Sequence, residues 1–314
     1  MDVSVVVPLY NEEENVRPLY ERLSQALEGL GRDYEIIFVD DGSTDGTLPL
    51  LEEIHSGDGR VAVLSLRKNF GQTAAFAAGF DFARGEVIVT MDGDLQNDPA
   101  DIQKLLELTK DYDIVSGWRR RRKDPFFSRR LPSMAANWLI STVTGVKLHD
   151  YGCSLKAYRK EVVKNLNLYG EMHRFIPAVA SWYGVNVAEV EVQHHPRTRG
   201  KSKYTMSRTI RVFLDLITVK FLQSFSTKPI QFFGPVGLIC TLAGFLISLY
   251  LSLEKLLRGA SIGGRPLLLL GVLLILLGIQ LIGMGLLGEM LARVYHESQK
   301  KAIYVLKKTL PGKS

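Results

Sequence analysis

The stretch Glu86-Val87-Ile88-Val89-Thr90-Met91-Asp92-Gly93-Asp94 is the most informative part of this sequence for the fold. Its first six residues have the composition of a β-strand, and two carboxylates follow where that strand ends. A strand end holds side chains rigidly while the next loop admits a ligand, and hard divalent cations prefer oxygen ligands. The stretch therefore predicts a strand that presents a metal-binding acidic pair. A turn with solvated carboxylates is the alternative, because short acidic triplets containing glycine are common in turns.

Other short apolar runs alternate with amphipathic stretches on both sides of this strand. Leucines recur at helical spacing in the first connection, and an alanine-rich segment suits the third. Such alternation predicts an α/β domain with a mostly parallel sheet, in which ligands gather at the carboxyl ends of the strands. The expected strands are Val3–Val7 (stopped by Pro8), Tyr34–Val39, Val61–Leu66 and Asp113–Ser116, and the expected helical residues are Leu19, Leu23, Leu27, Leu30 and Thr73–Phe82.

Composition limits the setting of the protein. The chain has 314 residues, of which 46% are hydrophobic, so it can hold one catalytic domain and a membrane part. Its only cysteines are Cys153, in a loop-like stretch, and Cys240, in an apolar run, which argues against a disulfide. The N-terminus lacks a basic region and a sufficiently long apolar run for a secretion signal. We therefore expect the catalytic domain in the cytoplasm.

Two apolar runs near the C-terminus, Phe232–Leu253 and Leu267–Gly288, are long enough to cross a bilayer. The segment between them carries fewer cations than the tail after Gly288, which predicts a cytoplasmic tail and, after two crossings, a cytoplasmic N-terminal domain. A buried helical hairpin in a soluble protein is the alternative. Small residues in the second run would allow close helix contact, within one chain or in a homo-oligomer; they are Gly278, Gly283, Gly285 and Gly288.

These features divide the chain into four parts. Residues 1–205 form the cytoplasmic catalytic domain, 206–228 form juxtamembrane amphipathic helices, 229–289 form the transmembrane hairpin and 290–314 form a basic cytoplasmic tail. The net charge of +6 fits contact with anionic headgroups and an anionic lipid substrate. Nucleic-acid binding does not fit, because the cations cluster beside the membrane segments and no nucleic-acid module is recognisable.

The densest basic cluster lies between Gly117 and Arg130, where seven of fourteen residues are cationic and three are aromatic. One reading is a solvated loop. The other is a loop that captures a lipid phosphate, with guanidinium groups binding the phosphate oxygens and aromatic rings among the headgroups. The cations are Arg119, Arg120, Arg121, Arg122, Lys123, Arg129 and Arg130, and the aromatic residues are Trp118, Phe126 and Phe127.

Five motifs in order resemble the inverting polyprenyl-phosphate glycosyltransferases of GT-A fold, the family that includes dolichyl-phosphate mannose synthase. The ending Gly285–Tyr295 is similar to the bacterial two-helix branch, and Asp150–Arg159 is similar to the undecaprenyl-phosphate formamido-arabinose transferases within it. A glucosyl transferase of that branch is a related alternative. The five motifs are Val7–Glu12, Val39–Thr47, Arg67–Gln72, Met91–Gln96 and Arg197–Tyr204.

The resemblance implies a role for each matching residue. The nucleotide sugar would contact Pro8, Tyr10, Glu12, Asp40, Lys68 and Asp92, with Asp40 accepting a hydrogen bond from the base. Mg²⁺ or Mn²⁺ would be held by Asp92, Asp94 and Gln96. Arg197 and Lys203 would hold the leaving diphosphate, and the acceptor phosphate would contact Arg119, Arg129 and Ser133.

The implied reaction moves a sugar, expected from a UDP-linked donor, to a polyprenyl phosphate such as undecaprenyl phosphate, with inversion. A phosphate monoester is already ionised at neutral pH, so no strong general base is required. Asp150 is grouped with the catalytic residues Asp94, Arg197 and Lys203 as a positioning residue, with a turn or cap carboxylate as the alternative. Some relatives carry an acidic residue where this chain has Cys153, and that departure leaves the base unassigned.

The resemblance further implies a multi-pass protein of the inner, cytoplasmic membrane, with both termini in the cytoplasm. Two other functions share the nucleotide motifs. A processive polysaccharide synthase would usually add a Gln-x-x-Arg-Trp motif and more membrane helices, neither of which is found in the sequence. A non-catalytic membrane scaffold would not need the intact acidic and basic site residues.

Overall fold

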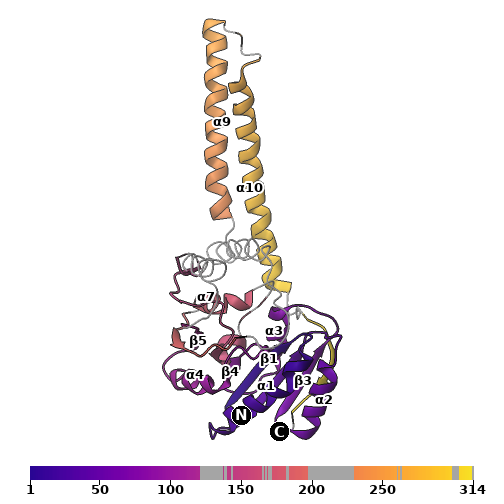
Figure 1. Cartoon of the computed structure of the whole chain (residues 1–314). Helices are drawn as coiled ribbons and strands as arrows, with labels where there is room; N and C mark the ends of the chain where they lie inside the picture. Colours follow the sequence, from indigo (N-terminus) through magenta and orange to yellow (C-terminus); the bar gives the residue numbers. More distant parts are fainter. Residues whose placement is uncertain are drawn as a thin grey trace. The chain divides into compact units, whose positions relative to one another are not determined.

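The computed structural model describes residues 1–120, 137, 140–142, 144–164, 166, 168, 172–181, 184–196, 230–259, 261, 264–298 and 304–312, of which 230, 289 and 292–298 are described in backbone only. The chain forms two compact units. The first comprises Met1–Ile217 together with Ala302–Ser314, and the second is Thr218–Lys301. Both chain ends thus belong to the first unit (Figure 1).

The first unit is built on an eight-stranded sheet with the order β7-β5-β6-β4-β1-β2-β3-β8. Strands β1 to β4 are parallel neighbours, whereas β6 and β8 run antiparallel to the strands beside them. The bounds are β1 Val3–Leu9, β2 Tyr34–Asp40, β3 Val61–Leu66, β4 Val87–Thr90, β5 Ile114–Trp118, β6 Lys156–Arg159, β7 Val187–Glu191 and β8 Leu306–Leu310.

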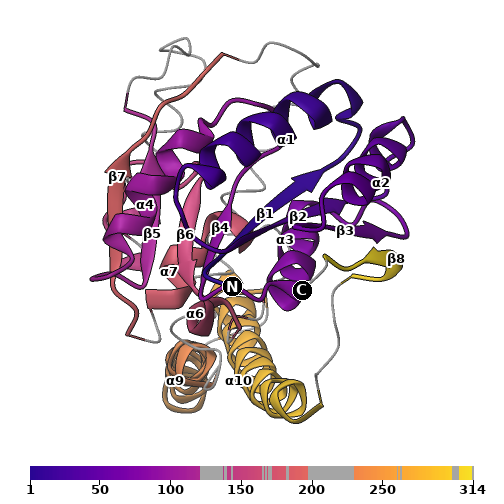
Figure 2. The same cartoon turned by 90° about the horizontal axis from the view of Figure 1, so that it is seen from below.

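Helices cover both faces of this sheet (Figure 2). A hydrophobic core lies under the face that carries α1, α2 and α4, where alternate strand residues such as Val5 and Phe38 meet Leu19 and Leu23 of α1. Burial of these apolar side chains is the main favourable contribution to folding. The bounds on this face are α1 Glu13–Glu28, α2 Thr47–Gly57, η1 Pro99–Asp101 and α4 Ile102–Leu108, and on the other α3 Gln72–Phe82, α6 Lys160–Lys164, η3 Met172–Arg174 and α7 Ile176–Ser181.

The expected α/β architecture with a mostly parallel sheet is confirmed. One boundary was wrong, because β1 continues through Pro8 to Leu9. The carbonyl of Val6 faces β4, where it accepts a hydrogen bond from Met91 N. Pro8 is two residues further along the strand, so its nitrogen faces β4 as well. It lies beyond Val6–Thr90, which is the last residue pair between β1 and β4. Pro8 cannot donate the next hydrogen bond toward β4, and the pairing with β4 ends there, while β1 continues to pair with β2 through Leu9.

Two antiparallel strands were not expected from the sequence. Strand β6 enters the sheet between β4 and β5. Strand β8, within the stretch expected to be a tail, adds to the far edge against β3, and Arg67 N donates to the carbonyl of Val305 at 3.0 Å. The last described residues are therefore part of the catalytic unit's sheet.

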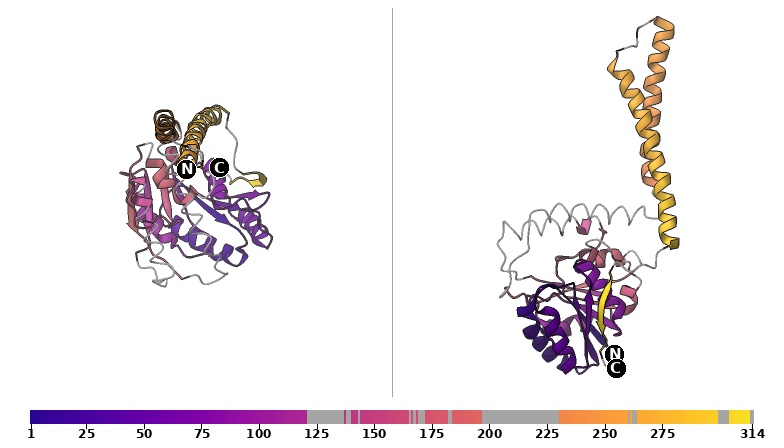
Figure 3. Two further views of the ribbon diagram at one scale, coloured as in Figure 1. Left: turned by 90° about the horizontal axis from the view of Figure 1, so that it is seen from above. Right: turned by 90° about the vertical axis from the view of Figure 1, so that its right-hand side faces the viewer.

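The second unit consists of two long antiparallel helices, α9 Ile230–Arg258 and α10 Pro266–Ser298, that lie side by side (Figure 3). Both are long and apolar enough to cross a membrane. Glycines allow close contact: a Cβ on Gly278 would lie 2.1 Å from Thr241 Oγ1, and one on Gly244 would lie 2.5 Å from the carbonyl of Gly271. Gly283, expected to contribute as well, faces open space.

Candidate active site

The carboxyl ends of β1, β2, β3 and β4 meet at one edge of the sheet, as the parallel order requires. Residues expected to contact the nucleotide sugar lie at each of these ends. Pro8, Tyr10 and Glu12 are at the end of β1 or just after it, Asp40 ends β2, Lys68 follows β3 and Asp92 follows β4. Segments far apart in the sequence thus contribute to a single edge.

The loops after β2 and β3 are held against each other by Asp41. Its carboxylate accepts from the backbone N–H groups of Phe70 at 2.7 Å and Gly71 at 2.9 Å. Gly42 has a φ of +70°, and a Cβ there would lie 2.4 Å from the carbonyl carbon of Lys68. Only glycine therefore permits this approach, which fixes the loop that carries Lys68.

Asp40 is expected to accept a hydrogen bond from the nucleotide base, but in the structure its carboxylate is enclosed by other residues. Its side chain is buried, one carboxylate oxygen accepts from Ser65 Oγ at 3.0 Å, and the other accepts from Ser43 N at 3.1 Å. A carboxylate oxygen has more than one lone pair, so a further donor could still bind. The contacts seen here show Asp40 orienting the loop after β2.

Among the residues that the structure describes, two non-glycine residues have a positive φ, and both lie at this edge: Asn11 after β1 at 53° and Leu95 after β4 at 61°. Such conformations are costly and persist where surrounding contacts enforce them, often at functional sites. Asn11 is held by Ser43 Oγ, which accepts from its N–H at 3.0 Å, and by Thr44 N, which donates to its side-chain oxygen at 2.8 Å.

The carboxylate of Asp92 is positioned from two directions. Gln72 Nε2, in the first turn of α3, donates to Asp92 Oδ1 at 2.6 Å. The N–H of Asp92 donates to Ser154 Oγ at 3.2 Å, and the same hydroxyl accepts from Asn97 Nδ2 at 2.8 Å. A Cβ on Gly93 would lie 2.2 Å from Leu9 Cδ2, so this loop rests directly on the end of β1.

The charges around Asp92 suit a divalent cation. Burial and the neighbouring Asp94 carboxylate raise the pKa of Asp92, while Ser154, Arg119 and Lys156 act in the opposite direction. A bound cation would remove that like-charge repulsion. Among the described residues no three His, Cys, Asp or Glu side chains converge on one point. The two carboxylates offer oxygen ligands of the kind that Mg²⁺ and Mn²⁺ prefer, and the N–H of Gln96 donates to Asp94 Oδ1 at 3.2 Å.

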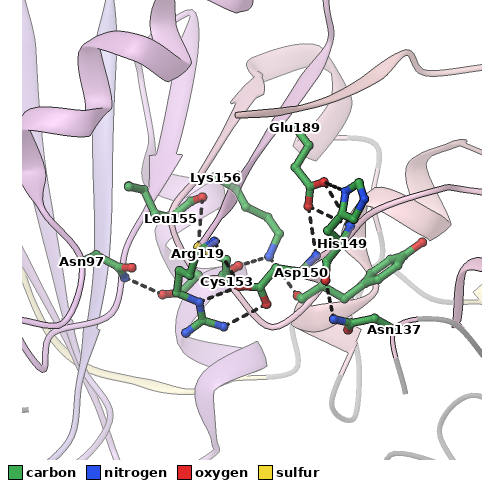
Figure 4. A network of polar contacts seen from close by, with 11 residues as sticks. Asn97, Arg119, Asn137, His149, Asp150, Cys153, Leu155, Lys156 and Glu189 are labelled. Carbon is green, nitrogen blue, oxygen red and sulfur yellow. Dashed lines mark hydrogen bonds and ion pairs between the residues drawn. The ribbon is translucent and has the colours of Figure 1, made fainter. Parts of the chain in front are cut away.

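Arg119, expected to contact the acceptor phosphate, is bound to Asp150 (Figure 4). Its Nε lies 2.7 Å from Asp150 Oδ2 and its Nη2 lies 3.0 Å from Asp150 Oδ1, which is a bidentate pair with both side chains largely buried. Burial opposes the charge on Arg119, but Asp150 outweighs it and raises the pKa of the guanidinium. The contacts with Asp150 use Nε and Nη2 of Arg119.

The turn that carries Asp150 is anchored to β7 by Glu189. Both oxygens of Glu189 lie 3.0 Å from His149 N, and Oε1 also lies 3.0 Å from Asp150 N. The ring of His149 stacks on Trp118 at 4.3 Å between centroids. In this geometry both carboxylate oxygens of Asp150 are bound to Arg119.

Two buried polar side chains lie behind this turn. Lys156 donates from Nζ to the carbonyl of Tyr151 at 3.3 Å and to that of Cys153. Cys153 is completely buried, and burial raises the pKa of its thiol to about 11. A neutral, enclosed thiol is not a nucleophile.

Four expected site residues lie outside the described residues: Arg129, Ser133, Arg197 and Lys203. Conversely, sequence reasoning gave no role to Gln72, Ser154, Lys156 or Glu189. The first three fall inside the motifs Arg67–Gln72 and Asp150–Arg159, so motif membership was a usable signal. Glu189 lies in an alternating strand, where a carboxylate is normally taken as solvent-facing.

Comparison with known proteins agrees with this arrangement. Residues 4–166 match the profile of glycosyl transferase family 2. The chain is 46% identical to a dodecaprenyl-phosphate galacturonate synthase of Rhizobium johnstonii over 100% of its own length and 94% of that protein. It is 39% identical to an undecaprenyl-phosphate 4-deoxy-4-formamido-L-arabinose transferase of Pseudomonas paraeruginosa, covering 98% and 90% of the two chains.

A solved structure supports the fold. Glucosyl-3-phosphoglycerate synthase from Mycobacterium tuberculosis, crystallised with Mn²⁺, UDP and glucosyl-3-phosphoglycerate, superposes with a TM-score of 0.55 at 19% identity. The match covers 71% of this chain and 79% of that one. At this identity the likeness concerns the fold.

Proposed function

The chain belongs to glycosyl transferase family 2 and is a polyprenyl-phosphate glycosyltransferase, and on that premise we propose that it moves a sugar from a UDP-linked donor to undecaprenyl phosphate or a closely related lipid, with inversion. The two relatives described above act on polyprenyl phosphates, one with galacturonate and one with formamido-arabinose. These two sugars are the first candidates for the donor. The product would be a polyprenyl monophosphate sugar.

The observation that supports this reaction best is the pairing of an acidic site with a cationic one at the carboxyl edge of the sheet. Asp92 is oriented by Gln72 and Ser154 on the donor side, and Arg119 is held by Asp150 on the acceptor side. Arg119 is bonded to Asp150, and the N–H of Asp92 is bonded to Ser154 four residues later in the same turn, which brings the two groups to one region of the site. A donor bound at Asp92 and a phosphate bound at Arg119 would therefore meet.

The chemistry requires little proton transfer from the protein. The acceptor phosphate is ionised at neutral pH, so its oxygen can attack the anomeric carbon without a general base. Arg119 would hold that phosphate, with Arg129 and Ser133 as further contacts, while Asp150 keeps the guanidinium in place. Asp150 itself need not accept a proton.

The donor's diphosphate leaves from the opposite face and gains charge as it does so. Mg²⁺ or Mn²⁺, held by Asp92, Asp94 and Gln96, would neutralise that charge, and the Mn²⁺ in the structural relative from Mycobacterium tuberculosis supports a divalent ion. Arg197 and Lys203 are proposed to hold the departing diphosphate. Pro8, Tyr10, Glu12, Asp40 and Lys68 are proposed to form the nucleotide pocket.

We further propose that the catalytic unit and the C-terminus lie on the same, cytoplasmic side of the inner membrane. The chain leaves the first unit before α9 and returns to it as β8 after α10. If both helices cross the bilayer, both ends of the hairpin must be on the side of the sheet. The return of the chain to the first unit thus supports a common side for both ends of the hairpin, independently of the positions of the lysines and arginines.

The test is transfer from radiolabelled UDP- and GDP-sugars to undecaprenyl phosphate by detergent-purified full-length protein. The panel includes the UDP derivatives of galacturonate, formamido-arabinose and glucose, each with Mn²⁺, with Mg²⁺ or with chelator. A chelator-sensitive lipid product from a UDP-sugar supports the proposal and identifies the sugar. If the folded protein binds a UDP-sugar but transfers nothing to any polyprenyl phosphate, the proposed acceptor is wrong.

A further inference from the structure

A single five-residue turn connects the donor side of the site to the acceptor side. At its start, Asp150 binds the guanidinium of Arg119 at 2.7 and 3.0 Å. At its end, Ser154 Oγ accepts from Asp92 N at 3.2 Å, and the carbonyl of Ser154 accepts from Thr90 Oγ1 at 2.7 Å. The position of this turn, Asp150–Ser154, therefore sets the distance between Arg119 and Asp92.

The turn is fixed from behind by Lys156. The ammonium donates to the carbonyls of Tyr151 and Cys153, so it bridges two peptide units inside the turn. Lys156 is the first residue of β6, where it pairs with Thr90 of β4 and with Ser116 of β5. Its side chain is only 2% exposed. The backbone of Lys156 is thus locked in the middle of the sheet, and its side chain transfers that rigidity to the turn.

Holding a turn with a buried ammonium that donates to carbonyls costs free energy. Removing an ammonium from water carries a large desolvation cost, and burial indeed lowers the pKa of Lys156. A buried methionine or leucine would fill similar space without that cost. The attraction of Asp150 and Asp92 offsets part of it.

We propose that Lys156 is a positioning residue that holds the turn Asp150–Ser154 so that the acceptor phosphate on Arg119 faces the donor beside Asp92. The proposal rests on the proposed function, because it assumes that these two sides bind acceptor and donor. Its physical basis is orientation: a displacement of about 1 Å between reacting groups can cost on the order of 100-fold in rate. Lys156 touches neither substrate in this scheme.

The first experiment compares full-length Lys156→Met with the wild type in detergent. We expect kcat to fall roughly 10- to 100-fold, while the KM and Kd of the UDP-sugar change by less than about threefold, because the donor pocket itself is intact. Lys164→Met is the matched control, since Lys164 also donates to a backbone carbonyl, that of Asp81 at 2.8 Å, but on α6. A loss of donor affinity as large as the loss of kcat would overturn the proposal.

The second experiment is a double-mutant cycle of Asp150→Asn and Ser154→Ala, which does not depend on the folding of Lys156→Met. If the turn couples the two sides, the combined loss in kcat/KM will differ from the product of the two single losses by roughly 2- to 150-fold, the range for coupled residues. Additive losses would show that the two sides are set independently, and the proposal would fail. Wild-type protein that transfers no sugar to a polyprenyl phosphate would instead refute the proposed function.

Discussion

Replacing Gly93 by alanine tests whether the acidic loop rests on β1 as tightly as the structure indicates. The added Cβ would lie 2.2 Å from Leu9 Cδ2 and 3.3 Å from the carbonyl of Pro8. Leu9 is 2% exposed and belongs to the main core, so it cannot move aside without displacing its neighbours. Overpacking of this kind costs about 1–3 kcal/mol.

For a domain of this size, each kcal/mol corresponds to about 2–4 °C in melting temperature, so Gly93→Ala should lower the Tm of the catalytic unit by roughly 2–12 °C. The measurement is Trp fluorescence on heating, with and without Mn²⁺ and UDP. Because the loop carries Asp92 and Asp94, we also expect the stabilisation by Mn²⁺ and UDP to shrink.

A second substitution, Leu9→Val, tests whether the contact with Leu9 causes the loss of stability. Leu9→Val removes the clashing Cδ2 atom and by itself should cost about 0.5–1.5 kcal/mol, by analogy with the loss of one buried methylene. The double variant Gly93→Ala/Leu9→Val should therefore be more stable than the sum of the two losses predicts. An unchanged Tm in Gly93→Ala, or strictly additive losses, would show that the loop is not held against β1.

Three further outcomes are expected. Asp94→Asn should reduce sugar transfer at least about 100-fold and remove the dependence on added Mn²⁺, because a metal ligand is lost. The lipid-product assay measures both effects. Retention of chelator-sensitive activity would contradict the assignment of Asp94 as a metal ligand. Deletion of residues 304–312 should lower the Tm and raise the KM of the donor severalfold. The reason is that β8 pairs with β3, and the carbonyl of Val305 holds Arg67, which precedes Lys68. A shortened protein with the wild-type KM would contradict a role of β8 in shaping the donor pocket. Burial raises the pKa of the Cys153 thiol to about 11, against 9.0 for the unperturbed group. The stability that the folded state gains by keeping this thiol protonated is therefore complete below pH 9 and is lost as pH rises through 11. Iodoacetamide at pH 8 should therefore label Cys153 in denatured but not in native protein, as read by peptide mass spectrometry, and rapid labelling of the native protein would refute its burial.

The parallel core was predictable because its strands are uninterrupted apolar runs. Val61–Leu66, for example, is buried throughout and could be read directly from composition. Strand β6 was missed because it is short and opens with Lys156, which sequence reasoning places in solvent. Strand β8 carries Lys307 and Lys308, as edge strands often do, and its partner is almost a whole chain length away.

In the site, too, positions next to a strand in sequence were predictable, whereas contacts between residues far apart in sequence were not. Motifs placed Asp92 and Asp40 correctly at strand ends, since each lies next to its own strand in sequence. The pairing of Arg119 with Asp150 and the anchoring of Asp150 by Glu189 depend on turns brought together only by the folded sheet. No local pattern distinguishes a guanidinium that awaits a phosphate from one already bound to a carboxylate.

Strand β8 also has a consequence for how the protein is made. The ribosome releases β3 early, but the residues that pair with it emerge only after both long helices have been synthesised. Until then β3 presents an open edge, which is a template for association with other chains. Completion of the sheet therefore waits for the synthesis of both long helices, so an unfinished chain keeps an exposed strand edge that the complete chain covers with β8.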